Sequence, residues 1–245
     1  KRLEDARITL VGFGAANVCI AKILIKAGAD PKKMIIVDSK GILSTKRDDI
    51  KESYREKIEF SKITNAEGRD GGIEEALYGQ DVLIALSKPG PDVIKKTWIS
   101  RMADDPIVFL CANPIPEMWP WEAKEAGARI VATGRSDFPN QVNNSLGFPA
   151  IFRGTLDVRA RAITDEMCIA AAYELARCAE DRGIHEEYLI PTMDEWEVFP
   201  RVAVKVAMKA IQQKVARLSF SEKELFRMAE EKIKRAREEV EALMD

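Results

Sequence analysis

The chain alternates short apolar runs with polar loops as far as residue 133. The runs are rich in isoleucine, valine and leucine, which is typical of strands buried on both faces of a parallel sheet. They lie at residues 8–11, 34–37, 81–86, 106–112 and 129–133. Segments with helical spacing or composition separate or follow them, at 18–25, 48–60, 73–78, 92–102 and 121–126. This alternation predicts an α/β fold with a doubly wound parallel sheet.

The pattern changes beyond residue 134. Residues 138–149 are rich in asparagine and proline and show neither a helical nor a strand period. From residue 165 the chain becomes helical, with apolar faces at 166–182 and 200–218. A capping box of Ser221 and Glu224 then opens a charged helix over 221–245. We expect one domain at 1–162 and a C-terminal helical extension at 163–245. The last helix either packs on its own domain or makes a contact in a homodimer or higher homo-oligomer.

Composition narrows the class of protein. Of the 245 residues, 46% are hydrophobic and 32% are charged, the balance of a soluble globular protein. A formal net charge of −2 gives no general attraction to nucleic acid or to an anionic membrane. No apolar run approaches the ~20 residues of a membrane span. The four cysteines form no C-x-x-C motif and His185 is the only histidine. We therefore expect free thiols in a reducing cytoplasm, and no metal site on this chain.

The first predicted strand leads into Gly12-x-Gly14-x-x-Asn17 and then into a helix. Glycines let the backbone turn sharply and let a ligand approach it, and the positive end of the helix favours a pyrophosphate. The dinucleotide-binding pattern has glycine or alanine in third place, so Asn17 brings the close packing of helix on strand into question. Asp38 ends the second strand about 20 residues on, where a carboxylate binds ribose hydroxyls. The pattern predicts a Rossmann-like nucleotide site, and the alternative is a tight turn in an ordinary α/β sheet.

Two features leave alternatives open. Asp38 favours NAD, because a carboxylate bonds the ribose hydroxyls and repels a 2′-phosphate. Lys40, Lys46 and Arg47 follow it, and they either accept that phosphate, which allows NADP, or form a solvated loop. The amides of 138–149 either form turns or offer neutral hydrogen bonds to a small polar ligand.

Three motifs resemble the malic enzymes of the short bacterial and archaeal type. They are Cys111-Ala-Asn-Pro-Ile-Pro-Glu117, the segment 134–160 with its Asn-Asn pair, and Leu86-Ser-Lys-Pro-Gly90. The resemblance covers residues 5–215, and the last helix departs from it. It implies that NAD, or NADP, oxidises malate, which loses CO2 to give pyruvate.

The resemblance also implies roles for individual residues. Asn113 contacts the substrate beside the nicotinamide, and an amide of Asn143 or Asn144, within the substrate-contacting loop 134–150, holds a substrate carboxylate. Asp38 faces the adenosine ribose, and Ser87 lies near the cofactor. The predicted cofactor contacts are Gly12, Gly14, Ala15, Ala16, Asn17, Asp38 and Ser87.

No residue here matches the family's general acid tyrosine, its general base lysine or its three acidic metal ligands. In the family these groups come from segments before the nucleotide-binding strand. We therefore assign no catalytic residue, and we expect Mg2+ or Mn2+ and the proton transfers to need a missing N-terminal part. The chain is expected to be the cofactor-binding portion of a malic enzyme, inactive by itself. The alternatives are a non-catalytic nucleotide-binding or assembly module and a malolactic-type enzyme.

Overall fold

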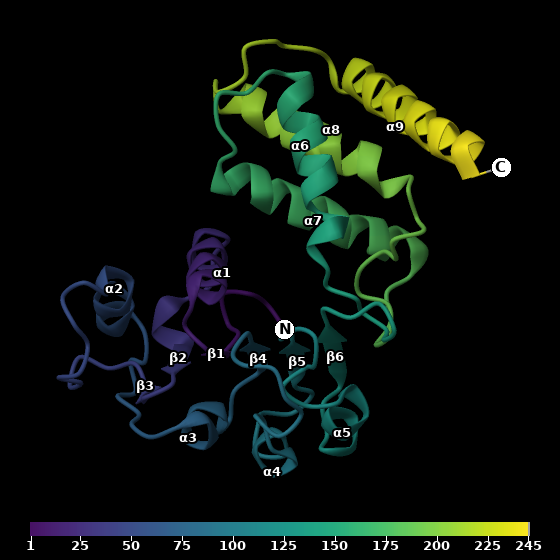
Figure 1. Cartoon of the computed structure of the whole chain (residues 1–245). Helices are drawn as coiled ribbons and strands as arrows, with labels where there is room; N and C mark the ends of the chain where they lie inside the picture. Colours follow the sequence, from purple (N-terminus) through teal and green to yellow (C-terminus); the bar gives the residue numbers. More distant parts are fainter. Residues whose placement is uncertain (245) are drawn as a thin grey trace. The chain divides into compact units, whose positions relative to one another are not determined.

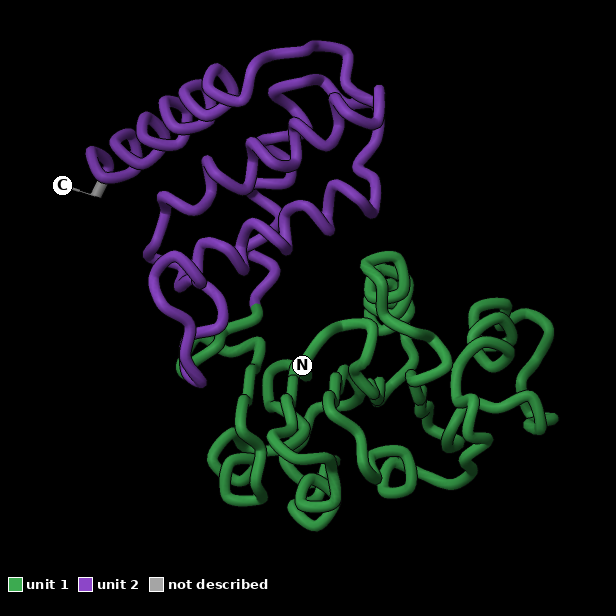
Figure 2. Tube along the Cα trace, turned by 180° about the vertical axis from the view of Figure 1, so that it is seen from behind, with its two compact units in different colours: residues 1–142 green, residues 143–245 purple. Residues whose placement is uncertain are grey.

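The structure is a computed structural model that describes residues 1–244. The chain forms two compact units, Lys1–Val142 and Asn143–Asp245 (Figure 2). The first unit ends just before the Asn-Asn pair, so this pair belongs with the C-terminal helices. The domain division that we predicted at residue 162 falls one helix later than this one.

Unit 1 is built on a six-stranded sheet with the order β3-β2-β1-β4-β5-β6 (Figure 1). Its strands are β1 (Ile8–Val11), β2 (Met34–Asp38), β3 (Gly41–Ile42), β4 (Val82–Ala85), β5 (Ile107–Leu110) and β6 (Ile130–Thr133). All neighbouring pairs are parallel except β2 and β3. The predicted doubly wound sheet is confirmed, with a short antiparallel edge strand that the sequence pattern did not predict. The strand order reverses between β1 and β4, and the carboxyl ends at such a point form the ligand-binding crevice of this kind of sheet.

Helices cover both faces of the sheet (Figure 1). They are α1 (Ala15–Lys26), α2 (Arg55–Ile63), α3 (Ile73–Leu77), α4 (Lys96–Ile99) and α5 (Pro120–Glu125), with a 3-10 turn η1 (Pro31–Lys33). On one face Ile8 and Leu10 share a core with Ala21 of α1 and Phe60 of α2. On the other face Leu83 shares a second core with residues of α3, α4 and α5. Because successive side chains of a strand point to opposite faces, a strand covered on both sides needs a continuous apolar run.

Two helices of unit 1 are shorter than their predicted ranges. α4 covers only Lys96–Ile99 of the predicted 92–102, because the backbone N–H groups of Val93 and Ile94 donate to the Glu117 carbonyl oxygen, at 3.2 and 3.1 Å. α2 begins at Arg55 rather than near residue 48, because a turn precedes it.

Unit 2 is helical. Its elements are η2 (Asn144–Leu146), α6 (Phe148–Asp157), α7 (Asp165–Arg182), α8 (Val198–Gln212) and α9 (Glu222–Met244). α8 packs against α6, α7 and α9 (Figure 1). Gly154 of α6 allows a close approach, because a Cβ atom there would overlap the Ala203 carbonyl oxygen of α8. Asp157 of α6 is buried and forms ion pairs with Arg153 and with Lys232 of α9.

In unit 2 the sequence pattern predicted α7 and α9 closely, ended α8 at residue 218 rather than at Gln212, and missed α6. η2 and the start of α6 lie in 138–149, where we expected neither helix nor strand. Pro149 lies in the first turn of α6, where a proline suits a helix start although it interrupts a periodic pattern. The capping box is confirmed: the Ser221 N–H donates to Glu224 Oε2 at 2.8 Å, and the Glu224 N–H to Ser221 Oγ at 3.3 Å. None of the helices described in residues 1–244 has both the length and the apolar character needed to cross a membrane.

Candidate cofactor site

The glycine turn after β1 leaves backbone exposed at the start of α1. Gly12 has φ +86°, and a Cβ atom there would overlap the carbonyl oxygen of Leu86, beyond the end of β4. Gly14 differs, because a Cβ atom built on it meets no protein atom within 4 Å. Gly14, Ala15 and Ala16 are exposed, and the first N–H groups of a helix have no partner within the helix. The turn is therefore fixed on its sheet side and open on its ligand side, as a pyrophosphate site requires.

Asn17 supports this turn from beneath. Its side chain is fully buried, and its amide nitrogen donates to the carbonyl oxygens of Val11 and Gly12, at 3.0 and 2.6 Å. The asparagine therefore does not loosen the helix, and it bonds the end of the strand. Within the described residues Asn17 Oδ1 is buried without a hydrogen-bond partner. Its predicted contact with a cofactor stays a prediction.

A hollow with a volume of about 520 Å3 opens beside the turn. It is lined by Phe13, Gly14, Ala15, Val18, Cys19, Lys22, Tyr54, Glu56 and Lys57. Its walls come from the start of α1 and the start of α2, and its size is that of a small-molecule site.

Asp38 stands at the carboxyl end of β2 with its carboxylate enclosed by donors. The Lys40 N–H donates to Oδ1 at 2.8 Å, Arg47 donates to both oxygens at 2.8 and 3.3 Å, and Lys57 Nζ donates to Oδ2 at 2.6 Å. Burial alone raises the pKa of Asp38, but the hydrogen bonds from Arg47, Lys57 and Lys40 outweigh it, so the pKa lies below its ordinary value. These bonds fill the acceptor positions of the carboxylate, so a ribose hydroxyl has to replace one of them.

The cations that follow Asp38 divide into different roles. Arg47 is shared between Asp38 and Asp49, which it contacts at 2.8 and 2.7 Å. Lys46 is exposed and pairs with Asp70 at 3.5 Å. Lys57, which sequence reasoning missed, reaches Asp38 from α2, although nothing in its local sequence distinguishes it from neighbouring charged residues.

A second group of residues lies where β4 and β5 end. Ser87 follows β4, and Ala112 and Asn113 follow β5. The carboxylate of Glu117 joins them: it accepts from the Ser87 N–H at 2.9 Å, from Ser87 Oγ at 3.3 Å and from the Ala112 N–H at 3.1 Å. Burial, together with the negative charge of Glu117, raises the pKa of Cys111 to about 12. Sequence reasoning quoted Glu117 within a motif but gave it no role.

The Asn-Asn pair lies in unit 2. Asn143 precedes η2 and caps it, its side-chain oxygen accepting from the Ser145 N–H at 2.9 Å. Asn144 is exposed, and within residues 1–244 its side chain makes no hydrogen bond. The structure places Asn113 in unit 1 and both of these amides in unit 2.

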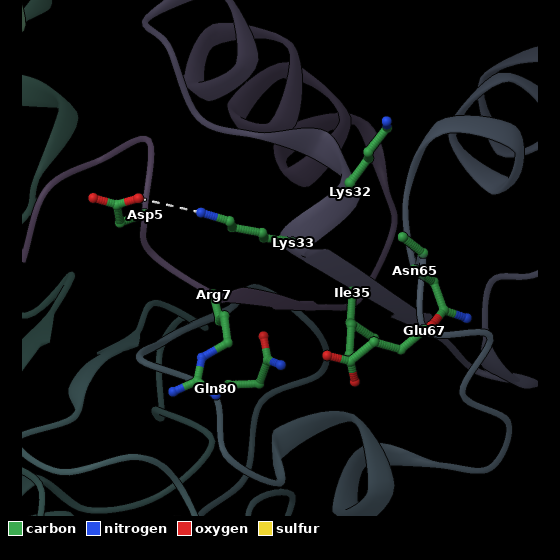
Figure 3. A pocket seen from close by; sticks show the side chains of 9 residues that line it. Asp5, Arg7, Lys32, Lys33, Ile35, Asn65, Glu67 and Gln80 are labelled. Atoms are coloured by element: carbon green, nitrogen blue, oxygen red, sulfur yellow. Dashed lines mark hydrogen bonds and ion pairs between the residues drawn. The ribbon is translucent and has the colours of Figure 1, made fainter.

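Another hollow, of about 320 Å3, opens at the amino ends of β1, β2 and β4 (Figure 3). Its charged side chains are of both signs, and Lys33 pairs with Asp5 at 3.3 Å while Arg7 pairs with Asp81 at 3.3 Å. No three His, Cys, Asp or Glu side chains in the described part of the chain lie close enough to hold a metal ion.

The sheet order, the open glycine turn and the acidic residue at the end of β2 together define a dinucleotide-binding domain of the Rossmann type. The family model described as "Malic enzyme, NAD binding domain" matches residues 1–213, and the chain belongs to this family.

Relatives agree with this assignment. The chain is 40% identical over 225 residues to a bifunctional malic/malolactic enzyme of Bacillus subtilis, covering 92% of this chain and 53% of that protein. It is 43% identical over 218 residues to an NAD-dependent malic enzyme of Geobacillus stearothermophilus, covering 89% and 44%. The crystal structure of Entamoeba histolytica malic enzyme matches it with a TM-score of 0.97 and 50% identity, over 100% of this chain and 51% of that one. The chain thus spans about half the length of these relatives.

Proposed function

We propose that this chain is the nucleotide-binding part of an NAD-dependent malic enzyme, which oxidises malate and releases CO2 to form pyruvate. The observation that carries the proposal is the open backbone at Gly14, Ala15 and Ala16, which shares the carboxyl edge of the sheet with Asp38 and Asn113. A sheet of this topology binds a dinucleotide across that edge.

The residues present fit such a cofactor. The space at the Gly14 Cβ position and the free N–H groups of α1 suit the pyrophosphate, and Asp38 suits the adenosine ribose. Ser87 and Asn113 lie at the half of the crevice that remains for the nicotinamide. When bound, NAD supplies a hydride acceptor for the malate C2 position. The chain's own part is to bind the cofactor and to orient the substrate.

We assign the substrate carboxylate to Asn144 rather than Asn143. The cap on η2 fixes the orientation of the Asn143 side chain, whose oxygen accepts from the Ser145 N–H. The Asn144 side chain is exposed and makes no hydrogen bond within the described residues, so its NH2 group can turn toward a carboxylate. An amide orients an anion by hydrogen bonding and does not add a charge that would compete with a metal for the substrate.

Asp38 favours NAD over NADP. A 2′-phosphate would have to approach a buried carboxylate, and Arg47 is shared with Asp49 and so is only partly available to the phosphate.

The proposal includes Mg2+ or Mn2+ in the whole protein. The described residues offer no group of ligands for it, so we derive no step through a metal on this chain. We also propose a cytoplasmic homodimer, which the free cysteines and the long α9 support.

The test uses the full-length protein that contains this chain. Incubation with malate, Mn2+ and NAD+ should yield NADH and pyruvate in equal amounts, and Asn113→Ala and Asn144→Ala should each lower kcat/KM at least tenfold, while Asn143→Ser, which can still cap η2, should change it little. Absence of turnover, or full activity of both alanine variants, would overturn the proposal. Lactate without net NADH would instead support malolactic chemistry, which the name of the Bacillus subtilis relative favours as the second candidate.

A further inference from the structure

Glu117 is a buried acidic side chain without a cationic partner. It is 0% exposed, and no ion pair to it is found in the described part of the chain. The side-chain hydrogen bonds found within the described residues are those that it accepts from the Ser87 N–H, the Ser87 hydroxyl and the Ala112 N–H. A buried carboxylate that only accepts hydrogen bonds shows the pattern of the ionised form. Because burying an unpaired charge is costly, its retention here calls for an explanation.

The position of Glu117 gives that explanation. Its carboxylate joins the loop after β4 to the loop after β5, and its carbonyl oxygen accepts from Val93 and Ile94 farther along the first of these loops. Asn113 directly follows Ala112, which Glu117 holds by its N–H. One residue therefore fixes both loops on the β4–β5 side of the crevice, where the nicotinamide half of a dinucleotide lies in this topology.

We propose that Glu117 is a positioning residue for the nicotinamide, and that its uncompensated negative charge favours the oxidised form of the cofactor. The oxidised nicotinamide ring carries a positive charge and the reduced ring is neutral, so a nearby fixed anion stabilises the first more than the second. The claim rests on the proposed function, because it takes the nicotinamide to lie in this half of the crevice.

The experiment measures the Kd of the chain for NAD+ and for NADH. In Glu117→Gln one oxygen becomes an NH2 group, which faces a backbone N–H at Ser87 or Ala112. We expect the Kd for NAD+ to rise about tenfold, because one loop beside the nicotinamide loses a hydrogen bond to a charged group and the site loses a fixed negative charge. The Kd for NADH should rise less, so the ratio of the Kd for NAD+ to the Kd for NADH should increase about threefold.

Two further variants separate this role from plain structural support. Glu117→Asp keeps the charge but shortens the reach, so both Kd values should rise together and their ratio should stay as in the wild type. If Glu117→Gln does not fold, Glu117→Asp still tests the positioning role. Glu122→Gln is the matched control, because Glu122 lies in the neighbouring α5, and its carboxylate accepts from the Trp119 N–H at 3.3 Å and pairs with Lys96 at 3.9 Å rather than with Ser87 or Ala112.

The outcomes are distinct. An unchanged Kd ratio in a folded Glu117→Gln, or unchanged Kd values in Glu117→Asp, would overturn the role of Glu117 while leaving cofactor binding intact. A wild-type chain that binds neither NAD+ nor NADH would overturn the proposed function and this inference with it.

Discussion

Asp38 and its cationic partners provide the sharpest test of cofactor choice. In Asp38→Asn the side chain keeps its shape but loses its charge, and one of its two oxygens becomes a donor. Lys57 then loses its 2.6 Å partner, while Arg47 keeps Asp49 at 2.7 Å. The side chains of Arg47 and Lys57 are 15% and 24% exposed, so they would remain at the ribose end of the site with their positive charge less compensated.

The size of the effect follows from this geometry. Removing a carboxylate at about 5 Å from a 2′-phosphate changes their interaction by roughly 3 kcal/mol at an effective dielectric constant of about 20. Solvent and the remaining partners reduce this value, and we expect a net change of about 2 kcal/mol, or about 30-fold, in the preference for NADP+ over NAD+.

The assay is a calorimetric titration of the wild type and of Asp38→Asn with each cofactor. The Kd for NAD+ should rise and the Kd for NADP+ should fall. The ratio of the Kd for NAD+ to the Kd for NADP+ should therefore increase about 30-fold. Asp49→Asn is the control, because it removes the other, more exposed partner of Arg47 and leaves Asp38 in place. A ratio unchanged in Asp38→Asn, or one moved equally by Asp49→Asn, would remove Asp38 from the ribose site.

The remaining predictions concern the turn, two thiols and acid stability. Gly12→Ala should lower the free energy of unfolding by about 2 kcal/mol or more, because Gly12 has a φ of +86° and a Cβ atom there would overlap a carbonyl oxygen. Gly14→Ala should keep the Tm of the wild type and weaken NAD+ binding. Equal Tm values for the two variants in melting curves would contradict this. At about pH 8, iodoacetamide should label the exposed Cys19, more slowly when NAD+ is bound, and should spare Cys111, whose pKa is about 12. Peptide mass spectrometry measures the labelling of both cysteines. Labelling of Cys111 before Cys19 would contradict the prediction. The pKa of Asp38 is lowered in the folded chain, so the stabilising contribution of Asp38 is present above its ordinary pKa of 3.8 and is lost as the pH falls through its pKa in the folded chain. The free energies of unfolding of the wild type and of Asp38→Asn, measured in urea, should therefore converge in acid. A difference that stays constant with pH would refute this prediction.

The sheet could be predicted because its physical requirement is visible in local sequence. Each parallel strand is covered on both faces, so it needs a continuous apolar run such as Ile8–Val11. β3 has only Gly41 and Ile42, too few residues for any period to show. α6 was not predicted, because proline and glycine usually interrupt helices and the segment contains Pro149 and Gly154. In the structure Pro149 suits the first turn of α6, and Gly154 makes room for α8.

The candidate site divides in the same way. Gly12, Gly14 and Asp38 follow a spacing that comes from the chemistry of a dinucleotide, and the sequence shows that spacing directly. Lys57 and Glu117 act through tertiary contacts, with Lys57 reaching Asp38 from 19 residues away and Glu117 reaching Ser87 from 30. No local pattern marks such residues, because their roles depend on which loops the sheet brings together.

The most direct test of the account is whether the start of α1 binds the cofactor. Calorimetry of the 245-residue chain with NAD+ should show one binding site. The Gly14→Val variant should melt at the same temperature as the wild type and show no binding heat, because its Cβ atom meets no protein atom within 4 Å and its side chain fills the space assigned to the pyrophosphate. No heat from the wild type, or equal binding by the folded variant, would contradict a dinucleotide site at this turn.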